Sequence, residues 1–122
     1  PINKKITAED VFNNIPTWVG LNSTSQAITG DGSTSTAIDV ITPVTEVDAT
    51  SNTAPCTLAN GANGQVKTII NVSTSGTNAI TITPANFRGG TTITLNAPGE
   101  TATLIFKNSN WNVIGGYGFV VA

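Results

Sequence analysis

The 122-residue sequence contains no histidine and only one cysteine, Cys56. Without histidine the chain lacks the most common general base, the most common metal ligand and every Ser-His or Cys-His catalytic pair. A single cysteine cannot close a disulfide within the chain, which excludes a disulfide-stabilised scaffold. Since no cationic residue lies near Cys56 in the sequence, we expect its thiol to be a small core group and not a nucleophile.

Charge is also scarce. Only 10% of the residues are charged, with five Lys and Arg against seven Asp and Glu, and the pI of the sequence is about 4.7. This composition offers no basic stripe for a phosphate backbone, so no nucleic-acid partner is predicted. The sequence has no apolar run of the roughly 18 residues that a membrane span needs and no recognisable secretion signal, so we expect a soluble protein with no membrane partner.

Few residues have the spacing that a catalytic, metal-binding or phosphate-binding site requires. Glu46 and Asp48 would lie on one face of a strand, as a glycosidase pair could, although a solvated strand face is the interpretation we favour. Asp31-Gly32-Ser33 matches only part of a calcium loop. Gly115-Gly116-Tyr117-Gly118 lacks the lysine of a phosphate-binding loop. We therefore predict a protein that is not an enzyme and that has no cofactor and no metal ion.

Residues 1–25 are predicted to form an N-terminal arm that precedes a single β domain at 26–122. Thr7 can cap a short helix, with Asp10 completing a capping box, and Pro16 ends that helix by Ile15. The arm is rich in large apolar residues, for which we predict contact with a neighbouring subunit or a larger particle, the alternative being that they cover an open end of the β core. These residues are Ile2, Ile6, Val11, Phe12, Ile15, Trp18, Val19 and Leu21.

The rest of the chain indicates an all-β fold, because short β-branched runs alternate with clusters of Gly, Pro, Asn and Ser. Turn pairs such as Asn60-Gly61 and Pro98-Gly99 favour hairpins, so we expect an antiparallel, hairpin-built sandwich or barrel-like body. The predicted strands are Gln26–Thr29, Ala37–Val47 with a break at Pro43, Cys56–Leu58, Gln65–Ser73, Ala79–Thr83, Thr91–Asn96, Thr101–Lys107 and Trp111–Val121.

The final run, from Trp111 to Ala122, is apolar and is interrupted by glycines. Interior glycines in a strand indicate a bend or a close approach of the backbone. An apolar tail of this kind favours either pairing with a neighbouring subunit or burial in the chain's own core. We predict self-association through four of its residues, which are Trp111, Tyr117, Phe119 and Val121.

Several segments together resemble a hairpin module found in virion proteins of tailed bacteriophages, in tail fibres and spikes and in head decoration (cement) proteins. The resemblance covers roughly residues 50–118. It is carried by Thr68-Ile69-Ile70-Asn71-Val72, Ile80-Thr81-Ile82-Thr83-Pro84, Gly90-Thr91-Thr92-Ile93-Thr94-Leu95, Gly99-Glu100-Thr101-Ala102-Thr103-Leu104-Ile105-Phe106 and Trp111-Asn112-Val113-Ile114-Gly115-Gly116.

The resemblance implies a structural protein that is a homotrimer. Because the chain is short and begins with an apolar arm, it suits a decoration protein better than a long modular fibre. It would then be made in the host cytoplasm and bind the major capsid protein on the outer surface of the capsid. The alternative is a fibre or spike tip that binds a host receptor or carbohydrate.

Overall fold

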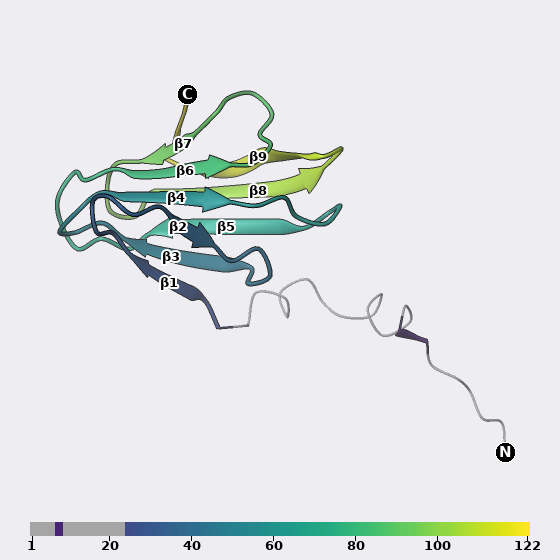
Figure 1. Ribbon diagram of the computed structural model, residues 1–122, viewed down its shortest axis with the longest axis horizontal. Helices are drawn as coiled ribbons and strands as arrows, with labels where there is room; N and C mark the ends of the chain where they lie inside the picture. Colours follow the sequence, from purple (N-terminus) through teal and green to yellow (C-terminus); the bar gives the residue numbers. More distant parts are fainter. Residues whose placement is uncertain (1–6, 9–23) are drawn as a thin grey trace, which may run out of the picture.

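In the computed structural model, residues 7, 8 and 24–122 are described, and residues 24–122 form two five-stranded sheets (Figure 1). The order is β1-β3-β5-β8-β9 in sheet 1 and β10-β7-β6-β4-β2 in sheet 2. Neither sheet closes into a barrel. The strands are β1 (Gln26–Thr29), β2 (Thr36–Ile38), β3 (Val44–Asp48), β4 (Ala54–Leu58), β5 (Val66–Asn71), β6 (Ile80–Pro84), β7 (Ile93–Leu95), β8 (Thr101–Lys107), β9 (Asn110–Tyr117) and β10 (Val120–Val121).

The first six strands alternate between the two sheets, so the chain winds as a coil. β1, β3 and β5 are parallel neighbours in sheet 1, and β2, β4 and β6 are parallel neighbours in sheet 2. The pairing Gln26↔Thr45 and the pairing Thr36↔Cys56 show that each turn of the coil lies directly on the next. In such a stack each turn is stabilised mainly by its neighbours, as in repeat proteins.

The coil corrects the prediction of a body built from antiparallel hairpins. Among the described strands that follow one another directly, only β6 and β7, and β8 and β9, pair as hairpins, and both sheets are mixed. The glycine pairs Asn60-Gly61 and Pro98-Gly99, expected to reverse the chain, instead lie where it passes from one sheet to the other, and of their two glycines only Gly99 has a positive φ, 85°. A turn with positive φ redirects the backbone but does not decide whether the next strand returns to the same sheet.

The positions of the predicted strands are confirmed. Gln26–Thr29 and Thr101–Lys107 form with the predicted bounds, and the predicted break at Pro43 separates β2 from β3. The last predicted strand is divided, because Gly118 has a φ of 71° and the chain turns there from sheet 1 to sheet 2. Of the predicted arm only Thr7, Ala8, Thr24 and Ser25 are described, and its predicted helix lies outside the described residues apart from Thr7 and Ala8.

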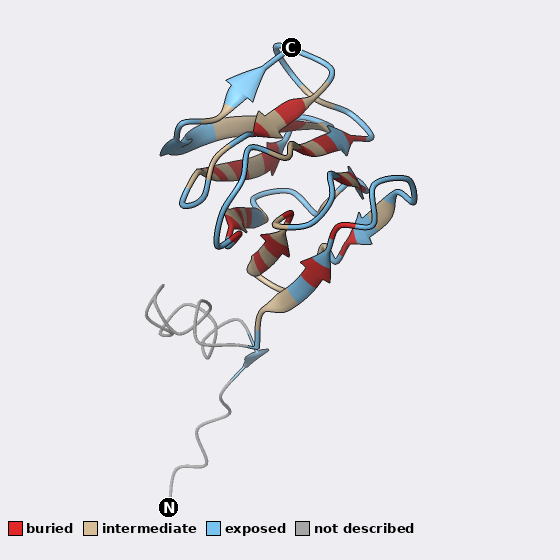
Figure 2. Ribbon diagram, turned by 90° about the vertical axis from the view of Figure 1, so that its left-hand side faces the viewer, coloured by how far each residue is buried: buried red, intermediate tan, exposed pale blue. Residues whose placement is uncertain are grey.

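One hydrophobic core lies between the two sheets, because alternate residues of each strand point inward. β8 shows this alternation from Thr101 to Phe106, and β6 shows it from Ile80 to Thr83. Figure 2 shows the resulting stripes of buried residues along the strands. The largest contributors are Val47, Leu58, Ile69, Ile80, Ile82, Ile93, Leu95, Leu104 and Trp111.

Adjacent glycines in β9 provide a matched test of this packing. Gly116 has a φ of 142°, and a Cβ there would collide with the carbonyl oxygen of Thr101, whereas a Cβ at Gly115 would meet nothing. Gly116→Ala should therefore lower the free energy of unfolding by about 2 kcal/mol, through backbone strain and a forced shift of β8. Gly115→Ala should change it by less than about 0.5 kcal/mol. Urea denaturation of both variants tests this, and equal effects would contradict the close approach of β9 to β8 at Gly116.

Candidate interaction surface

The acidic residues considered as catalytic or metal-binding candidates have local structural partners. The Asp48 carboxylate accepts hydrogen bonds from the hydroxyl and the N–H of Thr50, at 2.5 and 2.8 Å, and these bonds lower its pKa. Glu46, on the same strand, accepts a hydrogen bond of 3.1 Å from the Ser25 hydroxyl. In Asp31 the carboxylate caps the turn that follows β1, accepting the N–H groups of Ser33 and Thr34, which lowers its pKa.

Within the described residues no three His, Cys, Asp or Glu side chains gather where they could hold a metal ion. In the same part of the chain no helix has the length and hydropathy of a membrane span. Cys56 is buried, and this burial raises the pKa of its thiol to about 11. A thiol with so high a pKa is unreactive at neutral pH, which agrees with its expected place in the core.

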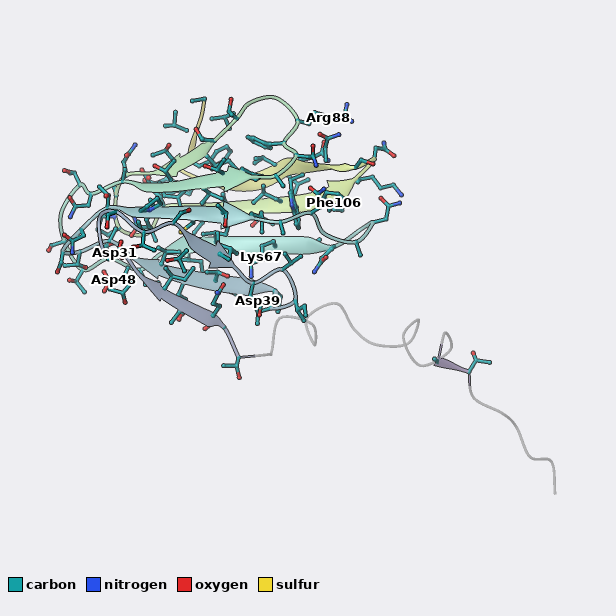
Figure 3. The ribbon with its side chains drawn as sticks, viewed as in Figure 1. Asp31, Asp39, Asp48, Lys67, Arg88 and Phe106 are labelled. Carbon is teal, nitrogen blue, oxygen red and sulfur yellow. The ribbon has the colours of Figure 1, made fainter. Side chains whose placement is uncertain are left out.

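A buried lysine is a feature that the sequence analysis did not identify. The Lys67 side chain is 0% exposed, and its ammonium donates to the carbonyl oxygens of Asp39 and Thr42, at 2.6 and 2.5 Å, and to the Thr42 hydroxyl, at 3.1 Å. Burial lowers the pKa of Lys67 to about 8, and the charge of nearby Asp39 partly opposes that shift. Figure 3 shows Lys67 and Asp39 beside each other at this loop.

These bonds hold the 39–43 loop in place from the inside. Gln65 adds a hydrogen bond to the carbonyl of Val40, and the Thr68 N–H donates to the carbonyl of Pro43 at 2.9 Å. With its carbonyl groups turned toward β5, the loop directs Ile41 outward, where that side chain is 87% exposed. Lys67 is therefore a structural element of the body.

The residues predicted for self-association divide into core and surface. Trp111 is 0% exposed, its indole N–H donates to the carbonyl of Ala59 at 2.9 Å, and its ring meets that of Phe106 edge to face, with 5.3 Å between centroids. The prediction that Trp111 contacts another subunit is therefore corrected, because its side chain is enclosed by its own chain. Phe119 also packs partly against the core, whereas Tyr117 and Val121 are exposed.

Two residues that were not singled out, Ile114 and Val120, join Tyr117 and Val121 on the exposed side. These four account for most of the large exposed hydrophobic residues that the described part of the chain contains, the others being Ile41, Val66 and Val72. The exposed fractions of Ile114, Tyr117, Val120 and Val121 are 58, 73, 52 and 37%. We call these four residues the C-terminal surface.

The C-terminal surface lies on the outermost strands of both sheets, β9 and β10, at the end of the stack opposite β1 (Figures 1 and 2). Ile114 lies where the pairing of β8 with β9 shifts by one residue, next to Val113, which is partly buried against the core. β10 is fixed against β7, since the N–H groups of Thr91 and Thr92 both donate to the carbonyl of Ala122, at 2.6 and 3.1 Å. The exposed side chains thus stand on an ordered backbone.

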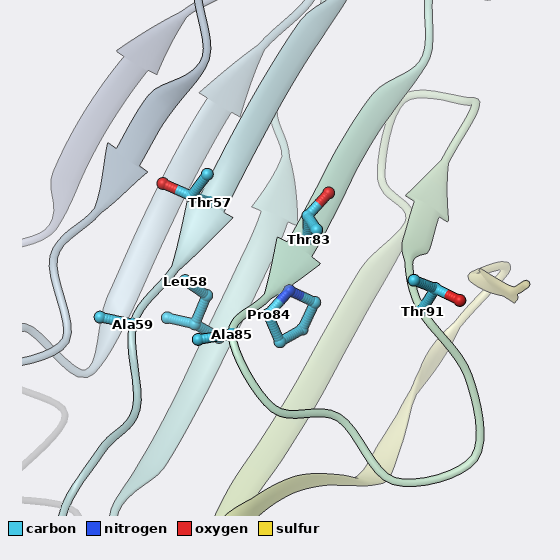
Figure 4. Close-up of a pocket in the computed structure, with 7 residues that line it drawn as sticks. All are labelled: Thr57, Leu58, Ala59, Thr83, Pro84, Ala85 and Thr91. Carbon is cyan, nitrogen blue, oxygen red and sulfur yellow. The ribbon is translucent and has the colours of Figure 1, made fainter.

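A groove of about 500 Å³ lies beside the ends of β4 and β6 (Figure 4). Thr57, Thr83 and Thr91 contribute hydroxyl groups, and the remaining lining is apolar, from Leu58, Ala59, Pro84 and Ala85. No aromatic ring and no charged group lines it. The groove can offer hydrogen bonds to a small polar ligand but no stacking platform for a sugar ring.

Comparison of the sequence with models of protein families and with curated proteins finds no match. The residues predicted for capsid contact, Ile2, Ile6, Val11, Phe12, Ile15, Trp18, Val19 and Leu21, all lie outside the described residues. Of the residues predicted to form interfaces, the structure therefore describes only those on β9 and β10 and in the turn between them.

Proposed function

We propose that the chain is a non-enzymatic structural protein that decorates and stabilises a bacteriophage capsid as a homotrimer. The observation that carries the proposal is the C-terminal surface, where four exposed apolar side chains stand on two edge strands that carry no charged residue. Open edge strands without charged residues can pair with another chain, and large exposed apolar groups are typical of surfaces that bind other proteins. The proposal that the assembly is a phage capsid comes from the resemblance of residues 50–118 to modules of phage virion proteins.

The proposed activity is stabilisation by binding. A protein that binds the assembled shell, but not its dissociated subunits, raises the stability of the shell by RT ln(1 + [L]/Kd) per site, which is about 2.7 kcal/mol at a free concentration of 100 Kd. No reaction is required. In this proposal the apolar residues of the arm bind the major capsid protein, and the β body provides self-association.

The capsid-binding role of the arm is tested in the full chain with Phe12→Asp combined with Trp18→Asp. Placing two charges in an apolar interface should weaken binding to capsids of the encoding phage at least 100-fold, because buried charges without partners are costly. The control is Ile41→Asp, which adds a charge to an exposed residue of the body. Cosedimentation with purified capsids measures the effect, and unchanged binding by the arm variant would contradict the proposal.

The alternative function is a fibre or spike tip that binds a receptor or carbohydrate. The groove with its three threonine hydroxyls favours this function, and its lack of an aromatic platform speaks against it. A glycan that binds the chain, with affinity lost in Thr83→Val and kept in Phe12→Asp/Trp18→Asp, would favour the alternative over decoration.

A further inference from the structure

Charge differs between the two ends of the stack. From Asn108 to Ala122 the sequence contains no Asp, Glu, Lys or Arg side chain. The end formed by β1 and its neighbours is acidic, with Asp31, Asp39 and Asp48 around it (Figure 3). An edge strand without charged residues lacks the usual protection against pairing with another chain.

The backbone at the edges formed by β9 and β10 has room for a partner. β9 and β10 each have a neighbour on one side only. On its outer side, β9 is engaged at Trp111, whose N–H donates to Asn86 and whose carbonyl accepts from Arg88, at 2.9 and 3.0 Å. Beyond Trp111, toward Tyr117, no described strand lies along that side.

The carboxylate of Glu100, which lies near the C-terminal surface, does not oppose association there. Glu100 lies close to Gly118, and its side chain accepts the N–H groups of Asn96 and Ala97, at 2.5 and 3.2 Å. Its charge is thus already compensated by hydrogen bonds within the chain. A partner at the C-terminal surface can therefore be apolar without leaving this carboxylate unpaired.

The size of the surface agrees with an interface between copies. The exposed fractions of its four residues together amount to an area on the order of 400 Å². A stable interface uses about 800 Å² per partner, of which roughly 60% is apolar. The surface and the polar residues around it would supply such a contribution.

From the charge difference, the open edges and the apolar area, we propose that copies of this chain associate by bringing their C-terminal surfaces together at a common symmetry axis. Neither β9 nor β10 has a charged side chain, so contact between these strands of two copies buries none of their own. Contact of this end with the other end would also bring in the carboxylates of Asp31, Asp39 and Asp48, whose desolvation is costly even where hydrogen bonds within the chain compensate part of the charge. When the C-terminal surfaces gather around one symmetry axis the assembly closes, as a dimer about a two-fold axis or as a ring about a three-fold axis, whereas contact of unlike ends can continue into a filament. This inference rests on the proposed function, because it names the surface through which the proposed homotrimer would form.

The test compares the sedimentation masses of the full chain, Tyr117→Asp/Val120→Asp and Ile41→Asp over a wide range of concentrations. The full chain and Ile41→Asp should form the same closed oligomer. The double variant should sediment at 12.5 kDa, or show a dissociation constant raised at least 100-fold. Both altered residues are exposed, so all three proteins should keep the same circular dichroism spectrum, and the double variant should lose only the part of the melting temperature that depends on protein concentration.

Three results would overturn the inference. These are a full chain that is monomeric throughout, a double variant that associates like the full chain, and a mass that grows without limit as the concentration rises. Capsid binding is measured separately, so the failure of capsid binding and the failure of self-association can be told apart. Association through this surface without capsid binding would remove decoration and leave the inference, whereas capsid binding by a monomeric full chain would remove the inference and the homotrimer but leave decoration.

Discussion

Trp111→Ala is expected to lower the free energy of unfolding by about 3–5 kcal/mol, the usual cost of removing a large buried aromatic ring. The ring is fully buried, stacks edge to face on Phe106 and donates a hydrogen bond to the carbonyl of Ala59. Alanine would leave a cavity between the sheets and a carbonyl without its donor. Since domains of this size are stable by about 5–15 kcal/mol, the change is a large part of the total. Equilibrium unfolding in urea measures it.

Two further variants separate the causes. Trp111→Phe keeps much of the volume but loses the hydrogen bond to Ala59, so its cost should be smaller, about 1–3 kcal/mol. Tyr117→Ala removes an aromatic ring from the same strand at a position that is 73% exposed, and should cost less than about 0.5 kcal/mol. Similar losses for Trp111→Ala and Tyr117→Ala would contradict the assignment of one ring to the core and the other to the surface.

Lys67→Met is expected to lower the free energy of unfolding at pH 7 by about 2 kcal/mol, because the carbonyls of Asp39 and Thr42 lose their donor. Removing a buried charge offsets part of this loss. Hydrogen exchange in the 39–43 loop should become faster. A variant that is as stable as the wild type, with an equally protected loop, would contradict the view that this ammonium holds the loop.

The lowered pKa of Lys67 predicts that the free energy of unfolding rises with pH above about pH 8. Its pKa falls from 10.5 to about 8 on folding, so between these values the unfolded chain keeps a proton that the folded chain has released. Stability therefore increases with pH there, by about 1 kcal/mol between pH 8 and 9. Above pH 9 Cys56 acts in the opposite direction, since folding raises its pKa from 9.0 to about 11. Lys67→Met should show no rise between pH 8 and 9.

The strands could be predicted because their chemistry is local. Alternating residues such as Ile80-Thr81-Ile82-Thr83 identify both the strand and the face that is buried. Pairing could not be predicted in the same way, since β3 pairs with β1 and β5 across intervening strands of the other sheet. The turn that does form the β8–β9 hairpin, at Asn108 and Ser109 with φ of 52° and 61°, lacks the glycine that usually marks it.

The candidate surface was predicted only in part, for a related reason. Aromatic residues six positions apart in one apolar run, Trp111 and Tyr117, have opposite environments, because the shifted pairing near Ile114 changes which side chains face inward. That irregularity leaves no mark in the sequence beyond the neighbouring glycines. Lys67 could not be placed inside either, because its partners are carbonyl groups of a loop that is distant in sequence.

The central claim is that this chain is an assembly protein, and its mass in solution tests that claim most directly. Light scattering of the purified full chain at two well-separated concentrations should give a constant mass near three times 12.5 kDa. A mass of 12.5 kDa at both concentrations would contradict the claim.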